Sequence, residues 1–96
     1  MMTAMYDVWM SPRYRRELRR MVRRGYDPEK MEAVVDMLAA GEPLPEQYQD
    51  HPLRGKWQGF RECHVSPDWL LVYKIEIDKL ILALTRTGTH DDLFKL

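Results

Sequence analysis

The chain has 96 residues, equal numbers of acidic and basic side chains, and a single cysteine. This length fits one domain, residues 1–96, with a small core and little room for a deep pocket. No apolar run approaches the roughly 20 residues of a membrane span, and the first residues lack the pattern of a signal peptide. One cysteine cannot form an internal disulfide. Together these features lead us to expect a cytoplasmic protein with no membrane partner.

The zero net charge hides an uneven distribution. Residues 1–27 carry seven arginines against three acids, whereas residues 28–50 carry six acids against one lysine. A neutral total argues against a protein that coats nucleic acid indiscriminately. The basic first segment still offers a local surface for phosphate, although the same arginines would also serve simply to solvate one face of a helix.

A short strand and a helix are predicted at the start of the chain. The segment Tyr6–Met10 is aromatic and β-branched, which is typical of a strand. Ser11 is a favourable N-cap, Pro12 suits the first helical position, and Gly25 is placed to end the helix. Apolar residues recur at helical spacing and form one stripe. These are Tyr14, Leu18, Met21 and Val22.

A second helix repeats these signals. Asp27 and Pro28 mark its start and Gly41 its end, and its stripe is Met31, Val34, Val35 and Leu38. Two such helices form a hairpin that needs a sheet to cover both stripes. Residues 42–56 then contain three prolines and no periodicity, which predicts a long loop of the kind that often carries function.

Three strands are predicted in the second half, at Gly59–Val65, Trp69–Ile77 and Lys79–Thr87. Their links are too short to cross over, so the strands form an antiparallel meander. The segment Leu80–Leu84 is apolar at every position, which suggests a strand covered on both faces. Gly88 breaks the last strand, and the residues after it can form a short terminal turn of helix. The predicted fold class is therefore α+β, with a two-helix hairpin on an antiparallel sheet.

Alternation along the first of these strands separates the side chains of Cys63 and His64. Cys63 and Val65 share one face and His64 lies on the other. If the first two residues face the core, His64 faces outward, and Cys63 is an inert packing thiol rather than a nucleophile.

All three histidines of the chain lie beside predicted turns or loops. His64 and Asp68 flank a hairpin turn and could lie close together, while His51 and His90 follow a loop and a strand end. Histidines in different environments can divide the roles of general base and general acid. With cations to stabilise the phosphorane, this is sufficient to cleave RNA without a metal, because the substrate supplies its own 2′-hydroxyl as nucleophile.

Other side chains on the same segments suit RNA binding. Trp69 and Phe94 offer faces for stacking bases, and four cations could hold phosphate. The cations are Arg54, Lys56, Arg61 and Arg86. Each assignment has a rival: Trp69 could belong to the core, Phe94 could anchor the tail, and the histidines with Asp68 could bind a metal. The last is disfavoured because no spacing matches a usual zinc pattern.

The chain resembles the YafQ-like branch of the RelE/ParE superfamily, the toxins of bacterial type II toxin–antitoxin systems. The resemblance covers nearly the whole chain. It is carried by "GYD", by "LPEQYQDHPLRGKWQGFRECHVSPDWLLVYKI" and by "RTGTHDDLF". Any one fragment alone would be weak, but their joint occurrence is highly specific.

The resemblance implies an endoribonuclease that cuts messenger RNA in the ribosomal A site and needs no cofactor. It places the active-site histidines at His51, His64 and His90, the acid at Asp68, and the aromatics at Trp69 and Phe94. It also implies an antitoxin partner, typically of the ribbon-helix-helix type. Phe60 stands where the family often has tyrosine, so a hydroxyl at that position is not essential here.

Two alternatives remain open at this stage. The superfamily also contains gyrase-poisoning toxins that are not nucleases, but such a chain would not need three histidines around one site. A binding module that has lost activity is the other, and the intact histidine set argues against it. The chain is also less basic than many superfamily members, which suits a toxin that meets its message on the ribosome.

Overall fold

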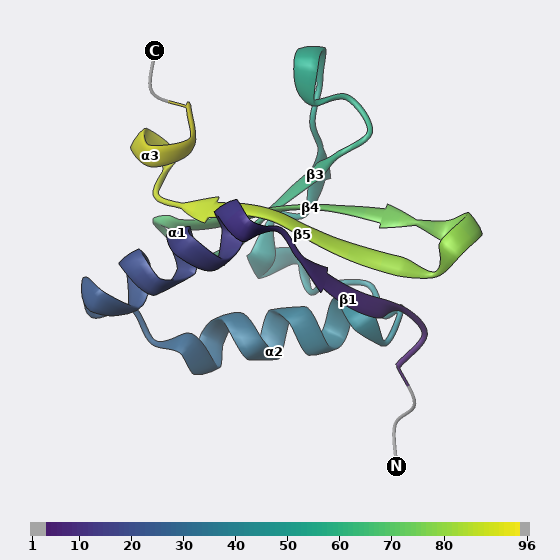
Figure 1. Cartoon of the computed structure of the whole chain (residues 1–96), viewed down its shortest axis with the longest axis horizontal. Helices are drawn as coiled ribbons and strands as arrows, with labels where there is room; N and C mark the ends of the chain where they lie inside the picture. The colour runs from purple at the N-terminus through teal and green to yellow at the C-terminus, as the bar shows by residue number, and fades with distance from the viewer. Residues whose placement is uncertain (1–3, 95–96) are drawn as a thin grey trace.

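A sheet of five strands carries two helices on one face in the computed structural model, which describes residues 4–94 (Figure 1). The elements, in chain order, are β1 (Asp7–Met10), α1 (Pro12–Arg23), α2 (Pro28–Ala39), η1 (Glu46–Tyr48), β2 (His51–Pro52), η2 (Gly55–Trp57), β3 (Arg61–Ser66), β4 (Trp69–Glu76), η3 (Ile77–Lys79), β5 (Ile81–Gly88) and α3 (His90–Phe94). The η elements are short pieces of 3₁₀ helix. The α+β fold class is thus confirmed. None of the helices within residues 4–94 is long and apolar enough to cross a membrane.

Both helices begin and end where their sequence signals indicate. The Ser11 hydroxyl accepts a hydrogen bond from the amide of Tyr14 at 2.9 Å, and the Asp27 carboxylate accepts one from the second helix in the same way. Gly25 and Gly41 follow the last turns with positive φ values, a conformation that glycine adopts at little cost. These local contacts explain why the hairpin could be predicted.

The stripe of the first helix is only partly correct. Tyr14 and Met21 are buried, but Val22 is 40% exposed. The third buried residue of this helix is the charged Glu17, which lies between Tyr14 and Met21. The second stripe packs as predicted, with Val35 partly buried at its margin.

The strand order is β1-β5-β4-β3-β2. The antiparallel meander of β3, β4 and β5 is confirmed. At one edge β1 pairs with β5 in parallel, so the sheet is mixed rather than wholly antiparallel. At the other edge β2 pairs with β3, and it comes from the segment expected to be only loop.

The last strand begins later than predicted. Residues 77–79 form η3, and Leu80 takes a left-handed conformation with φ of 53°, so β5 starts at Ile81. The apolar run 80–84 is also not covered on both faces. Leu82 and Leu84 are buried against the helices, whereas Ile81 and Ala83 stay partly exposed on the other side. That expectation was wrong because, among residues 4–94, no layer lies over this part of the sheet's second face.

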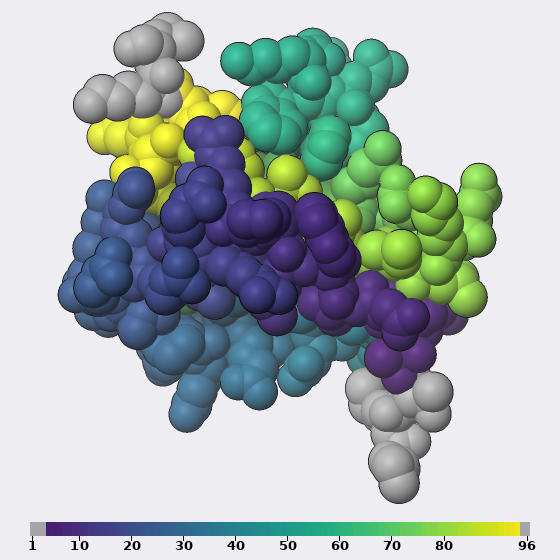
Figure 2. All heavy atoms as spheres, viewed as in Figure 1, coloured from purple at the N-terminus to yellow at the C-terminus, as the bar shows by residue number. Residues whose placement is uncertain are grey.

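The two faces of the sheet carry cores of different size. The larger core lies between the sheet and the helices α1 and α2, and includes Trp69, Leu71 and Tyr73 of β4. On the opposite face Leu70 and Val72 pack with Leu93 of α3. We call this second side the open face. Residues 53–60 and α3 project from it, as the teal and yellow atoms of Figure 2 show.

A β-bulge in β5 changes which side chains reach the open face. Tyr73 pairs with Leu84, but the preceding Val72 pairs with Arg86, so Thr85 is the extra residue. Before the bulge the even-numbered residues of β5 face the helices. After it Thr87 faces the helices and Arg86 faces the open side, because paired residues share a face.

Candidate active site

The strand register brings the histidine-bearing segments to one end of the open face. His64 pairs with Leu70, which pairs with Gly88, the residue that leads into α3. The neighbouring row is formed, strand by strand, by His51, Glu62, Val72 and Arg86. Adjacent strands lie about 4.8 Å apart, so residues on neighbouring strands of one row are close enough to contact the same substrate. The register thus places His51, His64 and the start of α3 at the same end of the open face.

His51 is held on both sides of its ring. Its Nδ1 lies 2.7 Å from the carbonyl oxygen of Gln49, and its Nε2 lies 3.4 Å from Oε1 of Glu62. Gln49 supplies that carbonyl from a left-handed conformation with φ of 48°. The His51 side chain is still 47% exposed, so it is oriented by the protein yet open to solvent.

Glu62 was missed by the sequence reasoning. It is only 5% exposed, and its second oxygen, Oε2, is buried without a hydrogen-bond partner among the described residues. Burying a carboxylate is costly unless it is compensated. Alternation could have found it, because Glu62 shares a strand face with His64.

His64 is half-buried on β3, and its outward orientation relative to Cys63 is confirmed. Its Nδ1 lies 3.4 Å from the carbonyl oxygen of Pro67 in the following turn. His64 also borders a hollow between β3, α2 and η1. Burial raises the pKa of the Cys63 thiol well above its usual range, which agrees with an inert packing role.

His64 and Asp68 flank the same turn, as expected, but their side chains are bonded to other groups. Among residues 4–94 no hydrogen bond or ion pair joins the two. The Asp68 carboxylate instead accepts a hydrogen bond at 2.7 Å from the hydroxyl of Tyr26, which raises the pKa of that phenol. Tyr26 lies at the turn between the helices and packs edge-on against Trp69. Asp68 is exposed in the turn that follows β3, the strand that carries His64.

Trp69 is a core residue, so its predicted role in stacking exposed bases was wrong. Its side chain is fully buried against the helices. The indole Nε1 donates to the hydroxyl of Thr87 at 2.8 Å, and that hydroxyl donates to the carbonyl of Leu70 at 2.7 Å. A ring with no exposed face cannot stack on RNA, and the indole instead ties β4 to β5 beneath the site.

Two of the four predicted phosphate ligands are already paired. Arg86 is buried and donates to Glu17 of α1, with Nη2 at 2.5 Å from the carboxylate. Arg61 lies on the helix face, where Asp50 accepts from its guanidinium at 3.2 Å and from the Tyr73 hydroxyl at 2.5 Å. Both arginines are therefore structural in this state of the protein.

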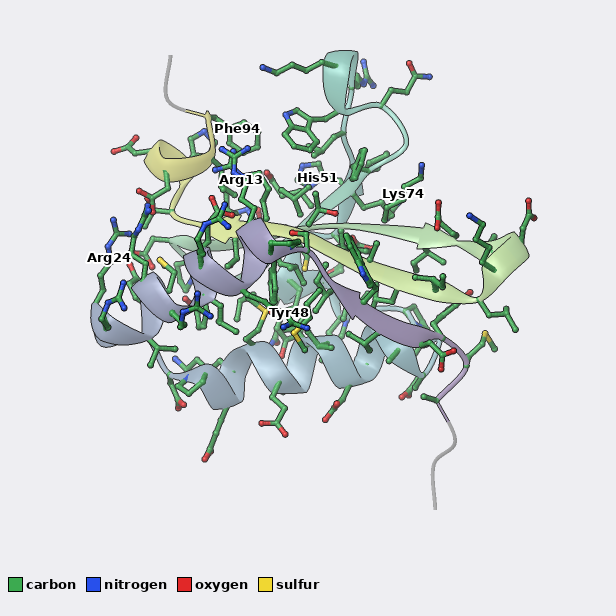
Figure 3. All side chains as sticks on the ribbon, viewed as in Figure 1. Arg13, Arg24, Tyr48, His51, Lys74 and Phe94 are labelled. Atoms are coloured by element: carbon green, nitrogen blue, oxygen red, sulfur yellow. The ribbon has the colours of Figure 1, made fainter. Side chains whose placement is uncertain are left out.

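The remaining predicted RNA ligands project from the open face. Arg54 and Lys56 are exposed on the segment around η2. Phe94 is partly buried in the second core, and its ring centroid lies 5.2 Å from that of His90. Figure 3 shows Phe94 on α3 and His51 on the same side of the sheet. Phe94 thus anchors α3 and still leaves part of its ring accessible.

A capping box and an ion pair position α3, which carries His90. The Thr89 hydroxyl accepts from the amide of Asp92, and the Asp92 carboxylate accepts from the amide of Thr89. Arg24, at the end of α1, donates to the same carboxylate at 2.7 Å. Chiefly because of this guanidinium, the pKa of Asp92 lies well below its usual range. His90 itself is exposed at the first position of the helix.

The site offers no ready set of metal ligands. Within the described part of the chain, no three side chains of histidine, cysteine, aspartate or glutamate lie close enough together to hold an ion. These side chains therefore do not form a metal centre with three protein ligands in this conformation.

In both sequence and fold the chain matches the toxins of the bacterial type II toxin–antitoxin class. Within that class the chain belongs to the YafQ family. The model of the family described as "Bacterial toxin of type II toxin-antitoxin system, YafQ" matches residues 6–95. The resemblance drawn from the sequence motifs is thereby confirmed.

Individual relatives agree in sequence and structure. The mRNA interferase toxin YafQ of Escherichia coli K12 is 43% identical over 89 residues, which cover 92% of this chain and 95% of the relative. A metal-bound toxin from Helicobacter pylori is 41% identical with a TM-score of 0.88, over 94% of this chain and all of that one. The toxin in the E. coli DinJ–YafQ toxin–antitoxin complex is 41% identical with a TM-score of 0.85, over 94% and 98%.

The Asp92 contacts predict how stability varies with pH. A carboxylate with a depressed pKa stabilises the fold above its unfolded-state pKa of about 4 and loses that contribution as the pH falls toward its folded value. Asp92→Asn should therefore be less stable than the wild type at pH 7. The difference should shrink as the pH falls below about 4, because the carboxyl of the unfolded wild type then binds a proton that the folded state does not bind. Urea unfolding between pH 3 and 8 measures this, with the exposed neighbour Asp91→Asn as control; a constant difference across the range would contradict it.

Proposed function

We propose that the protein is an endoribonuclease that cleaves messenger RNA in the ribosomal A site. The observation that carries this proposal is the alignment of His51 and His64 on β2 and β3 with the start of α3, where His90 lies. The relatives named mRNA interferase toxin support the same chemistry. The site is a shallow face rather than a deep pocket, so the message must be presented to it, and a ribosome with its A site open would do so.

The reaction needs one group to accept a proton and another to donate one. The 2′-hydroxyl of the ribose attacks the adjacent phosphorus as its proton passes to a base, and the 5′-oxygen leaves as it takes a proton from an acid. A 2′,3′-cyclic phosphate results. Histidines are suited to both roles near neutral pH. His51, His64 and His90 are the candidates for these roles, since all three retain exposed ring surface.

Neighbouring groups would orient the histidines and hold the substrate. Glu62 lies beneath the Nε2 of His51 and would stabilise a positive charge on that ring. Arg54 and Lys56 are exposed beside the site and would contact phosphate oxygens, where charge builds up in the transition state. Asp68 would act from the turn beside His64 after exchanging its contact with Tyr26 for one with the substrate or the imidazole.

Cleavage should not require a metal ion. The expected result is that messenger RNA on programmed ribosomes is cut at an unchanged rate after the toxin and the substrate are treated with a chelator that leaves the ribosomes intact. The new ends should carry a 2′,3′-cyclic phosphate or a 3′-phosphate, which end-specific enzymatic labelling identifies. Ends with a 3′-hydroxyl, or loss of the cut that returns with added copper or zinc, would refute the mechanism.

His90 should be one of the two proton-transfer groups. His90→Ala is expected to lower the single-turnover cleavage rate roughly 10²–10⁴-fold, the usual size of a general acid–base contribution. Folding should change little, because His90 is exposed. Asp91→Ala, on the same turn of α3, is the matched control for the integrity of the helix. Near-wild-type cleavage by the histidine variant would remove His90 from the mechanism, and a lowered melting temperature would make its role structural.

A cognate antitoxin, of the ribbon-helix-helix type, is the second proposed partner. The E. coli relative forms a complex with the antitoxin DinJ. In this chain a hollow between α1 and α3 presents mainly arginine side chains. They are Arg13, Arg16, Arg19, Arg20, Arg23 and Arg86, with Glu17 and Asp92 at the same hollow. An acidic, partly disordered antitoxin segment that folds on binding suits such a surface.

The antitoxin proposal predicts neutralisation by a small protein encoded beside this one. Co-expression should restore growth, and the purified pair should form a complex that does not cleave RNA. Reversing the charge of two exposed arginines, Arg16→Glu with Arg20→Glu, should weaken the complex more at low salt than at high salt. A neighbouring protein that neither binds nor restores growth would contradict the proposal.

A further inference from the structure

A second hollow lies on the open face, beyond the histidines and next to β1. It has a volume of about 500 Å³, within the range of small-molecule sites. Trp9 forms one wall with 53% of its surface exposed, and Phe60 and Lys74 form another. The floor is Ala83, which pairs with Trp9 on one side and with Lys74 on the other. A small residue between an aromatic ring and a lysine leaves room for a flat ligand.

The hollow lies over the part of β5 that we expected to be covered on both faces and that is uncovered on this one. Ile81 and Ala83 line it instead of packing beneath another layer. The Trp9 side chain points to the open face, because alternation on β1 turns its neighbours Val8 and Met10 to the helix face. Its ring therefore stands on the same face as the histidines.

The hollow is continuous with the candidate active site through Phe60. That ring packs against the core of Leu70 and Val72 that forms the floor beneath the histidines, and it meets the ring of Trp57 edge-on at 5.3 Å. The Lys74 ammonium lies 5.4 Å from the centroid of the same ring. Figure 3 shows Lys74 and His51 on the same side of the sheet. Lys74 follows Val72 by two residues on β4, a distance of about 7 Å along the strand.

We propose that this hollow binds one base of the messenger RNA, outside the pair of nucleotides between which the chain is cut. The proposal rests on the ribonuclease function proposed above and extends its substrate contacts. Trp9 would stack on the base, and Lys74 would neutralise the neighbouring phosphate. Glu76, also at the hollow, would accept hydrogen bonds from a base that carries an amino group. A single-stranded RNA supplies both the flat ring and the negative charge that these side chains fit.

The test combines a protein variant with base removal in the message. Ribosomes are programmed with messages in which one nucleotide at a time, on either side of the cut, carries an abasic ribose. At one position outside the cleaved pair, base removal should lower the wild-type kcat/KM about 5- to 160-fold, which corresponds to 1–3 kcal/mol for one stacked base. Trp9→Ala should lose a similar factor on the intact message and lose nothing more at that position.

Matched variants separate stacking from folding. Trp9→Phe keeps an aromatic face and should retain most of the activity, whereas Val8→Ala, on the opposite face of the same strand, should behave as the wild type. If the losses of kcat/KM from Trp9→Ala and from base removal were additive at every abasic position, the proposal would be refuted. A Trp9→Ala enzyme with wild-type activity would also refute it. An effect of Trp9→Ala on antitoxin inhibition alone would assign the hollow to the antitoxin and also refute it.

If the wild type does not cleave messenger RNA on ribosomes, the proposed function is refuted. A direct binding measurement then tests the base-binding hollow separately. In a Trp57→Phe background, with Trp69 buried, quenching of the remaining exposed indole reports contact with Trp9. A six-nucleotide single-stranded RNA should quench this fluorescence, and a phosphate-matched abasic strand should not. Equal quenching by both strands, or by neither, would overturn the base-binding site.

Discussion

The buried ion pair between Glu17 of α1 and Arg86 of β5 is the contact on which the candidate site depends. β1 accompanies β5 only as far as Leu84, so among residues 4–94 the end of β5 is paired with β4 on one side and with no strand on the other. Glu17 takes that place by accepting hydrogen bonds from the amide of Thr87 and from the Arg86 guanidinium. Removing one partner of such a pair costs about 3–5 kcal/mol, because the other charge is left buried. The pair thus fixes the strand end from which α3 departs.

The parts of the fold that could be predicted are those governed by neighbours in sequence. Ser11 and Asp27 cap their helices by contacts within the same turn, and the glycines that follow each helix take the conformations they favour. Alternation correctly separated His64 from Cys63 because both residues lie in one regular stretch of β3. The short helix expected after Gly88 is also stabilised locally, since Thr89 and Asp92 form a capping box within a single turn.

The errors arise where a distant segment decides the environment. The bulge in β5 changes the face of Arg86, and a sequence pattern cannot reveal an extra residue that only strand pairing defines. Trp69 is core because Tyr26 and Thr87, 43 positions before it and 18 after it, meet its ring and its indole nitrogen. The contact of Asp68 is also set by a distant residue, since the hydroxyl of Tyr26, in the turn between the two helices, donates a hydrogen bond to its carboxylate. Motif resemblance places a residue in the site without stating which way it faces.

The sheet separates the residues that hold the fold together from those available for chemistry. The helix side takes the larger core, including Trp69 and Tyr73, so changes there act first on stability. The open face has a smaller core, and its histidines stand at a strand edge, a half-buried strand position and a helix start. The buried Glu62 is the exception, because one of its oxygens has no hydrogen-bond partner within residues 4–94 and adds to neither core. A small domain that keeps such a group does so most readily where the charge orients a reacting side chain, and His51 is the side chain beside it.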